Sequence, residues 1–380
     1  MDFSLTDEQR LLRETVDRFV AEKCSFEQQR EMASTPQGFS RDIWGQFAEL
    51  GWLAVALPEE FEGFGGSQLD IAVLMEGFGH GLVLTPYLST VVLGGGLLTA
   101  GGSQAQKAEW LPAIAEGRML VAVAHTEPRS RYDLCHVEST ARKDGSGYVL
   151  DGHKSVVFHG GTADKLLVSA RTAGNVGDRD GITVFAIDPG RAVLRPYPTI
   201  DGGRAAELTL EGVSVESGDV VGEVDGGLEL IEYVVDRGIT AVCAEAVGIM
   251  GSLVWATSEY LKTREQFGRP LSKFQSLQHR SVDMLMEYEL SKSLARRAAV
   301  AVEDSEPVAR AQAASAAKIQ IGKAGKFVGQ QAVQLHGGMG MADELPIGHY
   351  FKRLSMINSL FGDVDYHLQR FADLDGSVLR

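Results

Sequence analysis

The spacing of apolar and polar residues divides the chain into a helical first part, a β-rich middle part and a helical last part. In the first part, Leu12, Val16 and Val20 recur at helical intervals, and Thr6 and Gln9 have the spacing of a capping box where this helix begins. Further helical patterns cover 41–50, 69–77, 88–100 and 105–116. The first part is therefore predicted to be all-helical.

Short runs with β-strand character form the middle part, and turns rich in Gly and Asp separate them. These runs cover 120–124, 148–150, 165–170, 182–187 and 207–213. From about Gly226 the chain returns to long helical patterns, and one of them places Val282, Leu285 and Met286 on a single face. The pattern over 308–335 is rich in Ala and Gly, which allows close helix packing and indicates a bundle.

These patterns predict an α+β protein of three domains. The expected bounds are 1–117 for an all-α domain, 118–225 for a β domain and 226–380 for a helical bundle domain. A chain of 380 residues is long enough for several domains with substantial buried cores.

Charge and cysteine usage narrow the class of protein. The formal net charge of -15 disfavours nucleic acid and an anionic membrane surface as partners. The three cysteines lie far apart without a CxxC pair, so neither a disulfide framework nor a zinc site is expected. The charged N-terminal stretch is unlike a signal peptide, and no apolar run approaches the length of a membrane span. We therefore expect a cytoplasmic protein without a metal site or a membrane partner.

A turn between two long helical patterns carries the first candidate chemistry. Gly268 and Pro270 break the helix, since glycine is permissive and proline lacks a backbone donor. The turn presents the guanidinium of Arg264, the amide of Gln266 and the ring of Phe267. Such a set suits a flat, anionic ligand. The alternative is a surface turn whose arginine offsets the helix dipole.

Three stretches combine with the α–β–α order to suggest a family. HTEP occupies 125–128, REQFG occupies 264–268 and QLHGGMG occupies 334–340. Together they resemble the acyl-CoA dehydrogenase family over essentially the whole chain. The resemblance implies an N-terminal helical domain, a middle β-barrel, a C-terminal four-helix bundle and assembly as a homotetramer or heterotetramer. It also implies that FAD oxidises an acyl-CoA to its trans-2-enoyl-CoA and that an electron-transfer flavoprotein accepts the electrons.

The resemblance further implies which residues bind FAD. In the family the turn reaches the FAD of a neighbouring subunit, with the arginine on the pyrophosphate and the phenylalanine near the adenine. The implied FAD contacts are Arg264, Gln266, Phe267 and Gln275 in the first segment and Gln334, Leu335, Gly337 and Gly338 in the second. Thr126 matches the position that touches the flavin pyrimidine. The two glycines also fit a helix C-cap after the Ala-rich helix, and both roles stay open.

Two departures from the family pattern concern substrate and flavin. The family continues TEP as GAGSD, whereas this chain has Arg-Ser-Arg-Tyr-Asp over 129–133. Tyr132 stands where a family serine helps to hold the acyl-CoA, and Arg131 either binds a carboxylate or CoA phosphate or is a solvated loop charge. The signature W-I-[ST]-N is replaced by Val-Val-Phe-His over 156–159. The hydroxyl donor is lost, but Phe158 can still pack on the flavin ring.

The third departure concerns the base that removes the α-proton, which must lie within hydrogen-bond reach of the α-carbon. The family glutamate of a Tyr-Glu-Gly segment falls on Phe361 or Gly362, and Asp363 is the nearest acid. Other members carry the glutamate on the helix that leads to RxxFG, where the slot falls on Gly238 and Glu245 lies two helical turns further on, on roughly the same face. Three alternatives stay open: Asp363, which also fits a helix N-cap, Glu245, or no base on this chain.

The last alternative agrees with bacterial relatives that work as heterotetramers of two unlike chains on steroid side chains or dicarboxylic acids. GHYFKR over 348–353 and LFGDVDYHLQRF over 360–371 resemble small subunits of pimeloyl-CoA-type dehydrogenases. Two functions are therefore predicted. The chain is an FAD-dependent acyl-CoA dehydrogenase, active alone or paired, or it is a non-catalytic partner subunit that completes the FAD site of a catalytic homologue.

Overall fold

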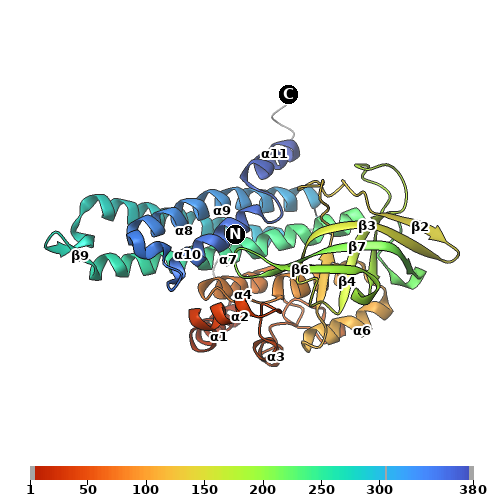
Figure 1. Cartoon of the computed structure of the whole chain (residues 1–380), viewed down its shortest axis with the longest axis horizontal. Coiled ribbons are helices and arrows are strands. Elements are labelled where there is room, and N and C mark those ends of the chain that lie inside the picture. Colours follow the sequence, from red (N-terminus) through yellow and green to blue (C-terminus); the bar gives the residue numbers. More distant parts are fainter. Residues whose placement is uncertain (1–4, 304–305, 376–380) are drawn as a thin grey trace. The chain divides into compact units, whose positions relative to one another are not determined.

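The computed structural model describes residues 5–303 and 306–375, which divide into two compact units. The helical unit comprises 1–30, 68–83 and 239–380, and the β-containing unit comprises 31–67 and 84–238. The long helix α7 (Gly227–Thr263) passes from one unit into the other. Figure 1 shows the elements in sequence colours. The division into three domains at 117/118 and 225/226 stays a prediction.

The first helix, α1 (Asp7–Lys23), begins as the sequence predicts. Thr6 and Gln9 form the expected capping box, because the Gln9 N–H donates to Thr6 Oγ1 at 3.2 Å and the Thr6 N–H donates to Gln9 Oε1 at 3.1 Å. Helix α1 packs against α4 (Gln68–His80), where the amide of Gln9 donates to Asp70 Oδ1 at 3.0 Å. Helix α2 (Phe26–Ser34), which follows α1, was not predicted.

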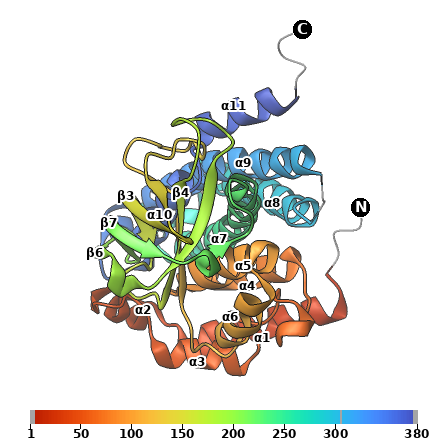
Figure 2. The same cartoon turned by 90° about the vertical axis from the view of Figure 1, so that its right-hand side faces the viewer.

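The C-terminal helices form a bundle around α9 (Pro307–His336). Helix α9 contacts α8 (Gln275–Ala301), α10 (Pro346–Ser359) and α11 (Val364–Asp375), and Figures 1 and 2 show these helices side by side. The close packing expected from the Ala- and Gly-rich pattern is confirmed. A Cβ at Gly322 would overlap Asn358 and Val364, and a Cβ at Gly329 would overlap Phe351. Small residues on α9 therefore let α10 and α11 approach its backbone.

Helix α8 buries Met284, Tyr288 and Ser291, whereas Val282 and Met286 of the predicted apolar face are 53% and 54% exposed. The apolar face therefore differs from the side that packs within the described chain. One sequence prediction about the long helices is wrong, because α7 is long and apolar enough to cross a membrane. However, 83% of its most apolar 18-residue window is buried within the protein.

The β-containing unit is built on one mixed sheet with the strand order β6-β7-β3-β2-β4-β5-β8, and β1 pairs with β4. Strand β4 pairs in parallel with β1 and β2, and the other pairs are antiparallel. The strands are β1 (Val121–Ala124), β2 (Thr140–Asp144), β3 (Gly147–Phe158), β4 (Lys165–Arg171), β5 (Ile182–Ile187), β6 (Val193–Pro198), β7 (Arg204–Val215) and β8 (Val220–Val221). Among these strands β6 and β8 remain at the two ends, so a closed barrel is not found there and stays a prediction.

Among the helices of the same unit, the π-helix η2 (Leu88–Gly95) contacts strand β1. The other helices of the unit include α3 (Arg41–Glu49), α5 (Gly96–Gly101) and α6 (Gln104–Ala115), and α5 and α6 contact η2. The predicted single helix over 88–100 is thus a π-helix followed by an α-helix. Thr90 Oγ1 accepts from the Val121 N–H at 3.2 Å and donates to the Val121 carbonyl at 3.1 Å, and a Cβ at Gly94 would overlap the Val121 side chain. Helix η2 therefore fixes the start of β1, from which the HTEP segment follows.

Candidate functional site

The predicted anion-binding turn is a small β-hairpin that links α7 to α8. Helix α7 ends at Thr263, and the chain then pairs β9 (Glu265–Gln266) with β10 (Arg269–Pro270). Phe267 and Gly268 have φ values of 55° and 76°, which is the geometry of a two-residue primed turn. Phe267 is 89% exposed at the tip of this hairpin. An apolar ring this exposed is available to another molecule.

The second predicted segment lies at the same end of the helical unit. Helix α9 ends at His336, whose imidazole stacks on Tyr260 of α7 with ring centroids 4.4 Å apart. Tyr260 lies one helical turn before Arg264, so the structure brings the hairpin and the QLHGG segment together. A Cβ at Gly337 or Gly338 would meet no atom within 4 Å, and Gly337 has a φ of 62°. The backbone there is open to the close approach of a ligand.

We define the clamp as the hairpin 264–270 with Gln275 and the segment 334–338. Most of its side chains are exposed. Arg264, Gln266, Gln275 and Gln334 all reach solvent, whereas Leu335 is 7% exposed and packs into the helical unit. Leu335 can therefore contribute only its backbone to a ligand. Guanidinium, amide and aromatic groups beside two glycines with open space around them make a chemically suitable surface for a pyrophosphate joined to an adenosine.

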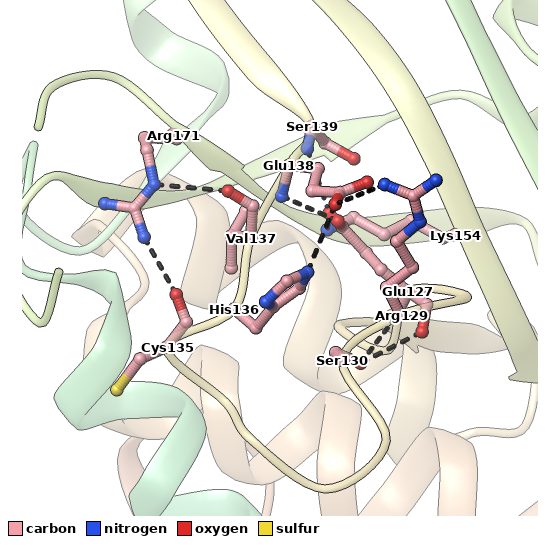
Figure 3. A network of polar contacts seen from close by, with 10 residues as sticks. All are labelled: Glu127, Arg129, Ser130, Cys135, His136, Val137, Glu138, Ser139, Lys154 and Arg171. Atoms are coloured by element: carbon pink, nitrogen blue, oxygen red, sulfur yellow. Dashed lines mark hydrogen bonds and ion pairs between the residues drawn. The ribbon is translucent and has the colours of Figure 1, made fainter. Parts of the chain in front are cut away.

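The HTEP segment of the β-containing unit is anchored by a buried ion pair (Figure 3). Lys154 Nζ donates to Glu127 Oε1 at 2.6 Å and to Ser169 Oγ at 3.0 Å. The Glu127 carboxylate also accepts from the N–H groups of Glu138 at 2.7 Å and Ser139 at 3.1 Å. Burial lowers the pKa of Lys154 to about 8, against the opposing charge of Glu127. Burial raises the pKa of Glu127, but Lys154 and the hydrogen bonds outweigh it and the pKa is lowered.

Thr126 and Phe158 flank this ion pair along the chain. The Ser155 N–H donates to the Thr126 carbonyl at 2.9 Å, which joins the end of β1 to β3. Strand β3 has an irregular register between Lys154 and Val157, and Val156 adopts a φ of 54°. A β-branched residue in this region is unusual, and the bulge re-aims the following side chains. Thr126 and Phe158 are half-buried, and their contact with a flavin stays a prediction.

The substrate residues predicted from the sequence lie on a tight turn after Glu127. Ser130 closes this turn, because its N–H and hydroxyl both donate to the Glu127 carbonyl, at 3.2 and 3.0 Å. Arg131 follows with a φ of 46° and is exposed, while Tyr132 is half-buried. Arg129 lies 3.7 Å from Glu138 in a solvated ion pair. The binding of acyl-CoA by Arg131 and Tyr132 stays a prediction.

Both predicted carboxylate bases have structural partners in the helical unit. Glu245 lies on α7 with a side chain 9% exposed, and Arg353 of α10 binds both of its oxygens, at 2.6 and 2.7 Å. Asp363 Oδ1 accepts from the Tyr366 N–H at 2.9 Å and so caps α11. The ion pair supplies the partner that a buried glutamate requires, and the N-cap role of Asp363 is confirmed.

The loop that aligns with the family base is held by two buried side chains that sequence reasoning missed. Lys318 Nζ donates to the carbonyls of Asn358 at 3.0 Å and Gly362 at 2.6 Å, and His367 Nε2 lies 3.2 Å from the Phe361 carbonyl. Burial lowers the pKa of Lys318 to about 8 and that of His367 to about 3. The only signal in the sequence was a charged residue within an Ala-rich helix.

The described residues contain no group of three or more His, Cys, Asp or Glu side chains arranged to hold a metal ion. Tyr260 and Lys154 were also missed by sequence reasoning, although both lie close to predicted site residues. Tyr260 shares a helical face with Arg264, and Lys154 is one of two charged residues, with Asp151, in β3. Neither feature identifies a partner distant in sequence.

Comparison with known proteins gives matches over nearly the whole chain. Models of the acyl-CoA dehydrogenase N-terminal, middle and C-terminal domains match residues 6–118, 122–213 and 225–373. The probable acyl-CoA dehydrogenase YngJ of Bacillus subtilis is 30% identical over 351 residues, covering 90% of this chain and 91% of the relative.

Two similar solved structures are each named for a pair of proteins. The ChsE4-ChsE5 complex from Mycobacterium tuberculosis has a chain with a TM-score of 0.90 and 27% identity, and the match covers 100% of both chains. A variant of the Tcur3481-Tcur3483 steroid ACAD has a chain with a TM-score of 0.88 and 29% identity, and the match covers 97% of this chain and 98% of that one.

Proposed function

The chain belongs to the acyl-CoA dehydrogenase family, and we propose that it is one subunit of a heteromeric, FAD-dependent acyl-CoA dehydrogenase. The assembly removes the α-proton and a β-hydrogen from an acyl-CoA and releases the trans-2-enoyl-CoA. In this proposal the present chain clamps the adenosine end of FAD, and a homologous partner chain supplies the base. An electron-transfer flavoprotein then takes up the electrons.

The clamp at the end of the helical unit supports the FAD assignment. Arg264 suits the pyrophosphate, Phe267 suits the adenine ring, and Gly337 and Gly338 leave their backbone open to the close approach of a ligand. When bound, FAD accepts the β-hydrogen as a hydride. The residues of this chain bind and orient the end of the cofactor that lies away from the reaction. An 89% exposed Phe267 fits this role, since its ring makes an edge contact with Phe274 at a centroid distance of 6.1 Å and most of its surface is open to another molecule.

The single observation that supports a base on another chain is that both candidate bases of this chain are bonded to other groups within it. A general base needs a free lone pair directed at the substrate proton. Both oxygens of Glu245 accept from Arg353, and Asp363 caps a helix. The predicted family slot falls on Phe361 or Gly362, in a loop whose carbonyls are bonded to Lys318 and His367. The base is therefore assigned to another chain.

The substrate class that fits is an acyl-CoA with a bulky or carboxylated acyl group. Arg129 and Arg131 lie on the turn that in the family meets the acyl-CoA, and they offer guanidinium groups to a carboxylate or a CoA phosphate. The similarity to the Tcur3481-Tcur3483 steroid ACAD supports the same class. We place the assembly in the cytoplasm, consistent with α7 being a mostly buried helix.

The visible spectrum tests this proposal. The chain is produced alone and together with a homologous chain that retains the family glutamate, and flavin absorbance is measured for both preparations. We expect stoichiometric flavin only in the co-produced assembly, and bleaching under anaerobic conditions by a steroid or dicarboxylic acyl-CoA. A chain that alone retains stoichiometric flavin and bleaches with acyl-CoA would show that it is a complete dehydrogenase.

A further inference from the structure

One aromatic contact joins the two segments of the clamp inside the helical unit. The ring planes of Tyr260 and His336 lie 25° apart at a centroid distance of 4.4 Å, and the Tyr260 hydroxyl donates to the His336 carbonyl at 3.4 Å. His336 is 7% exposed and Tyr260 is half-buried. The contact thus connects the last turn of α7 with the last residue of α9.

Each ring-bearing residue lies close to, or within, one clamp segment along the chain. The Tyr260 carbonyl accepts from the Arg264 N–H at 2.8 Å and from Thr263 Oγ1 at 3.2 Å. On α9, Gly337 follows His336 directly, and its N–H donates to the Gln334 carbonyl. The stacked rings are therefore carried by the same backbone segments as the arginine-bearing hairpin and the glycine pair.

The imidazole of His336 is held in one orientation. Its Nδ1 donates to the Ala332 carbonyl at 2.8 Å, which fixes the tautomer. Burial lowers the pKa of His336, while the hydrogen bond to Ala332 opposes this shift. The ring is therefore neutral near pH 7 and stacks on Tyr260 without burying a charge.

We propose that Tyr260 and His336 are positioning residues that hold the two clamp segments as one preformed site for the adenosine-diphosphate half of FAD. This inference rests on the proposed function. Two independent segments would each have to be ordered when the ligand binds, and that ordering lowers affinity. Because the stack forms during folding, the ligand meets a site that is already in place. An aromatic pair of this kind corresponds to about a two- to tenfold change in affinity.

A double-mutant cycle on ligand affinity tests the coupling. FAD fluorescence quenching is measured on the full assembly for R264M, Q334A and the double variant, first with Tyr260 and then in a Y260L background. With Tyr260 present, we expect the losses of FAD binding free energy in R264M and Q334A to be non-additive, because both segments serve one preformed site. In Y260L, FAD affinity is expected to fall about two- to tenfold, and the two losses are expected to become additive.

Two further variants separate positioning from plain stability. Y260F keeps the ring, so its FAD affinity is expected to stay within about twofold of the parent. F26L removes a different aromatic–histidine pair of the same unit, in which the ring centroids of Phe26 and His349 lie 4.9 Å apart. F26L is expected to lower the melting temperature without changing FAD affinity or the coupling.

Unchanged FAD affinity and unchanged coupling in folded Y260L would overturn the inference, since the stack would then serve the bundle alone. If Y260L does not fold, H336N removes the stack from the other side, and the same two criteria apply. A parent assembly that binds no FAD would contradict the proposed function itself, and that result is obtained before any variant is compared.

Discussion

Breaking the Glu245–Arg353 ion pair is expected to cost stability through one identifiable mechanism. Arg353→Met would leave the Glu245 carboxylate on α7 without its guanidinium partner, in a place where the side chain is 9% exposed. Two short hydrogen bonds, at 2.6 and 2.7 Å, would be lost together. An unpaired charge buried in this way costs far more than the net contribution of the pair, because the carboxylate has already been removed from water.

The magnitude follows from burial. Removing one member of a buried pair lowers the free energy of unfolding by about 3–5 kcal/mol, so R353M is expected to lose that amount. The double variant E245M/R353M removes both charges. Its free energy of unfolding is expected to lie within about 1 kcal/mol of the parent's or to exceed it. Glu259 and Lys262 form a matched exposed pair with side chains 68% and 59% exposed. E259Q is expected to change stability by less than about 1 kcal/mol.

Urea unfolding followed by far-ultraviolet circular dichroism measures these differences for the helical signal. A loss below about 1 kcal/mol in R353M would refute the reasoning, as would a double variant as unstable as R353M. The double variant E245M/R353M also bears on chemistry. The assembly that contains it is expected to retain dehydrogenation, and loss of activity with flavin still bound would identify Glu245 as the base.

Three further predictions concern the clamp, the helix packing and a buried lysine. F267A is expected to weaken FAD binding about tenfold with an unchanged melting temperature, because the ring is 89% exposed; fluorescence titration measures the affinity. G248A is expected to cost at least about 1–3 kcal/mol by thermal unfolding, because its Cβ would overlap the Glu76 carbonyl, whereas G190A, with open space around it, serves as the control. Burial lowers the pKa of Lys318 from 10.5 to about 8. Between these two pH values the unfolded chain binds more protons at this group than the folded chain does. The contribution of this group to the free energy of unfolding therefore rises with pH. Urea titrations at pH 7 and pH 10 measure the rise in the free energy of unfolding for the parent and for K318M. The rise is expected to be smaller in K318M by up to about 3 kcal/mol, and an identical rise in both proteins would contradict the assigned pKa.

The sequence predicted long helices well because their periodicity is a local property. The capping box at Thr6 and the helices α3, α6 and α9 are confirmed near their expected bounds. Strand β2 was missed because it is mostly exposed and polar, and β6 was missed because it contains two prolines. The side of α8 that packs could not be predicted either, since an apolar stripe on a helix does not say which neighbour covers it.

The candidate site shows the same limit. The motif at 264–268 predicted a turn and its ligand chemistry, but the hairpin geometry rests on positive φ values at Phe267 and Gly268. The sequence indicated that a buried Glu245 needs a partner, yet Arg353 lies 108 residues away and could be identified only from the fold. Likewise, the stacking of Tyr260 on His336 joins positions 76 residues apart. Contacts of this range depend on tertiary packing and leave no periodic signal.

Exchange of the α-proton of an acyl-CoA with solvent deuterium tests most directly whether this chain lacks a base. The chain alone, with FAD added, is incubated with a steroid or dicarboxylic acyl-CoA in deuterium oxide, and deuterium at the α-carbon is followed by mass spectrometry. We predict no exchange above the buffer rate for this chain and rapid exchange for the assembly with its homologous partner. Exchange by this chain alone, abolished by D363N or by E245Q, would contradict the account.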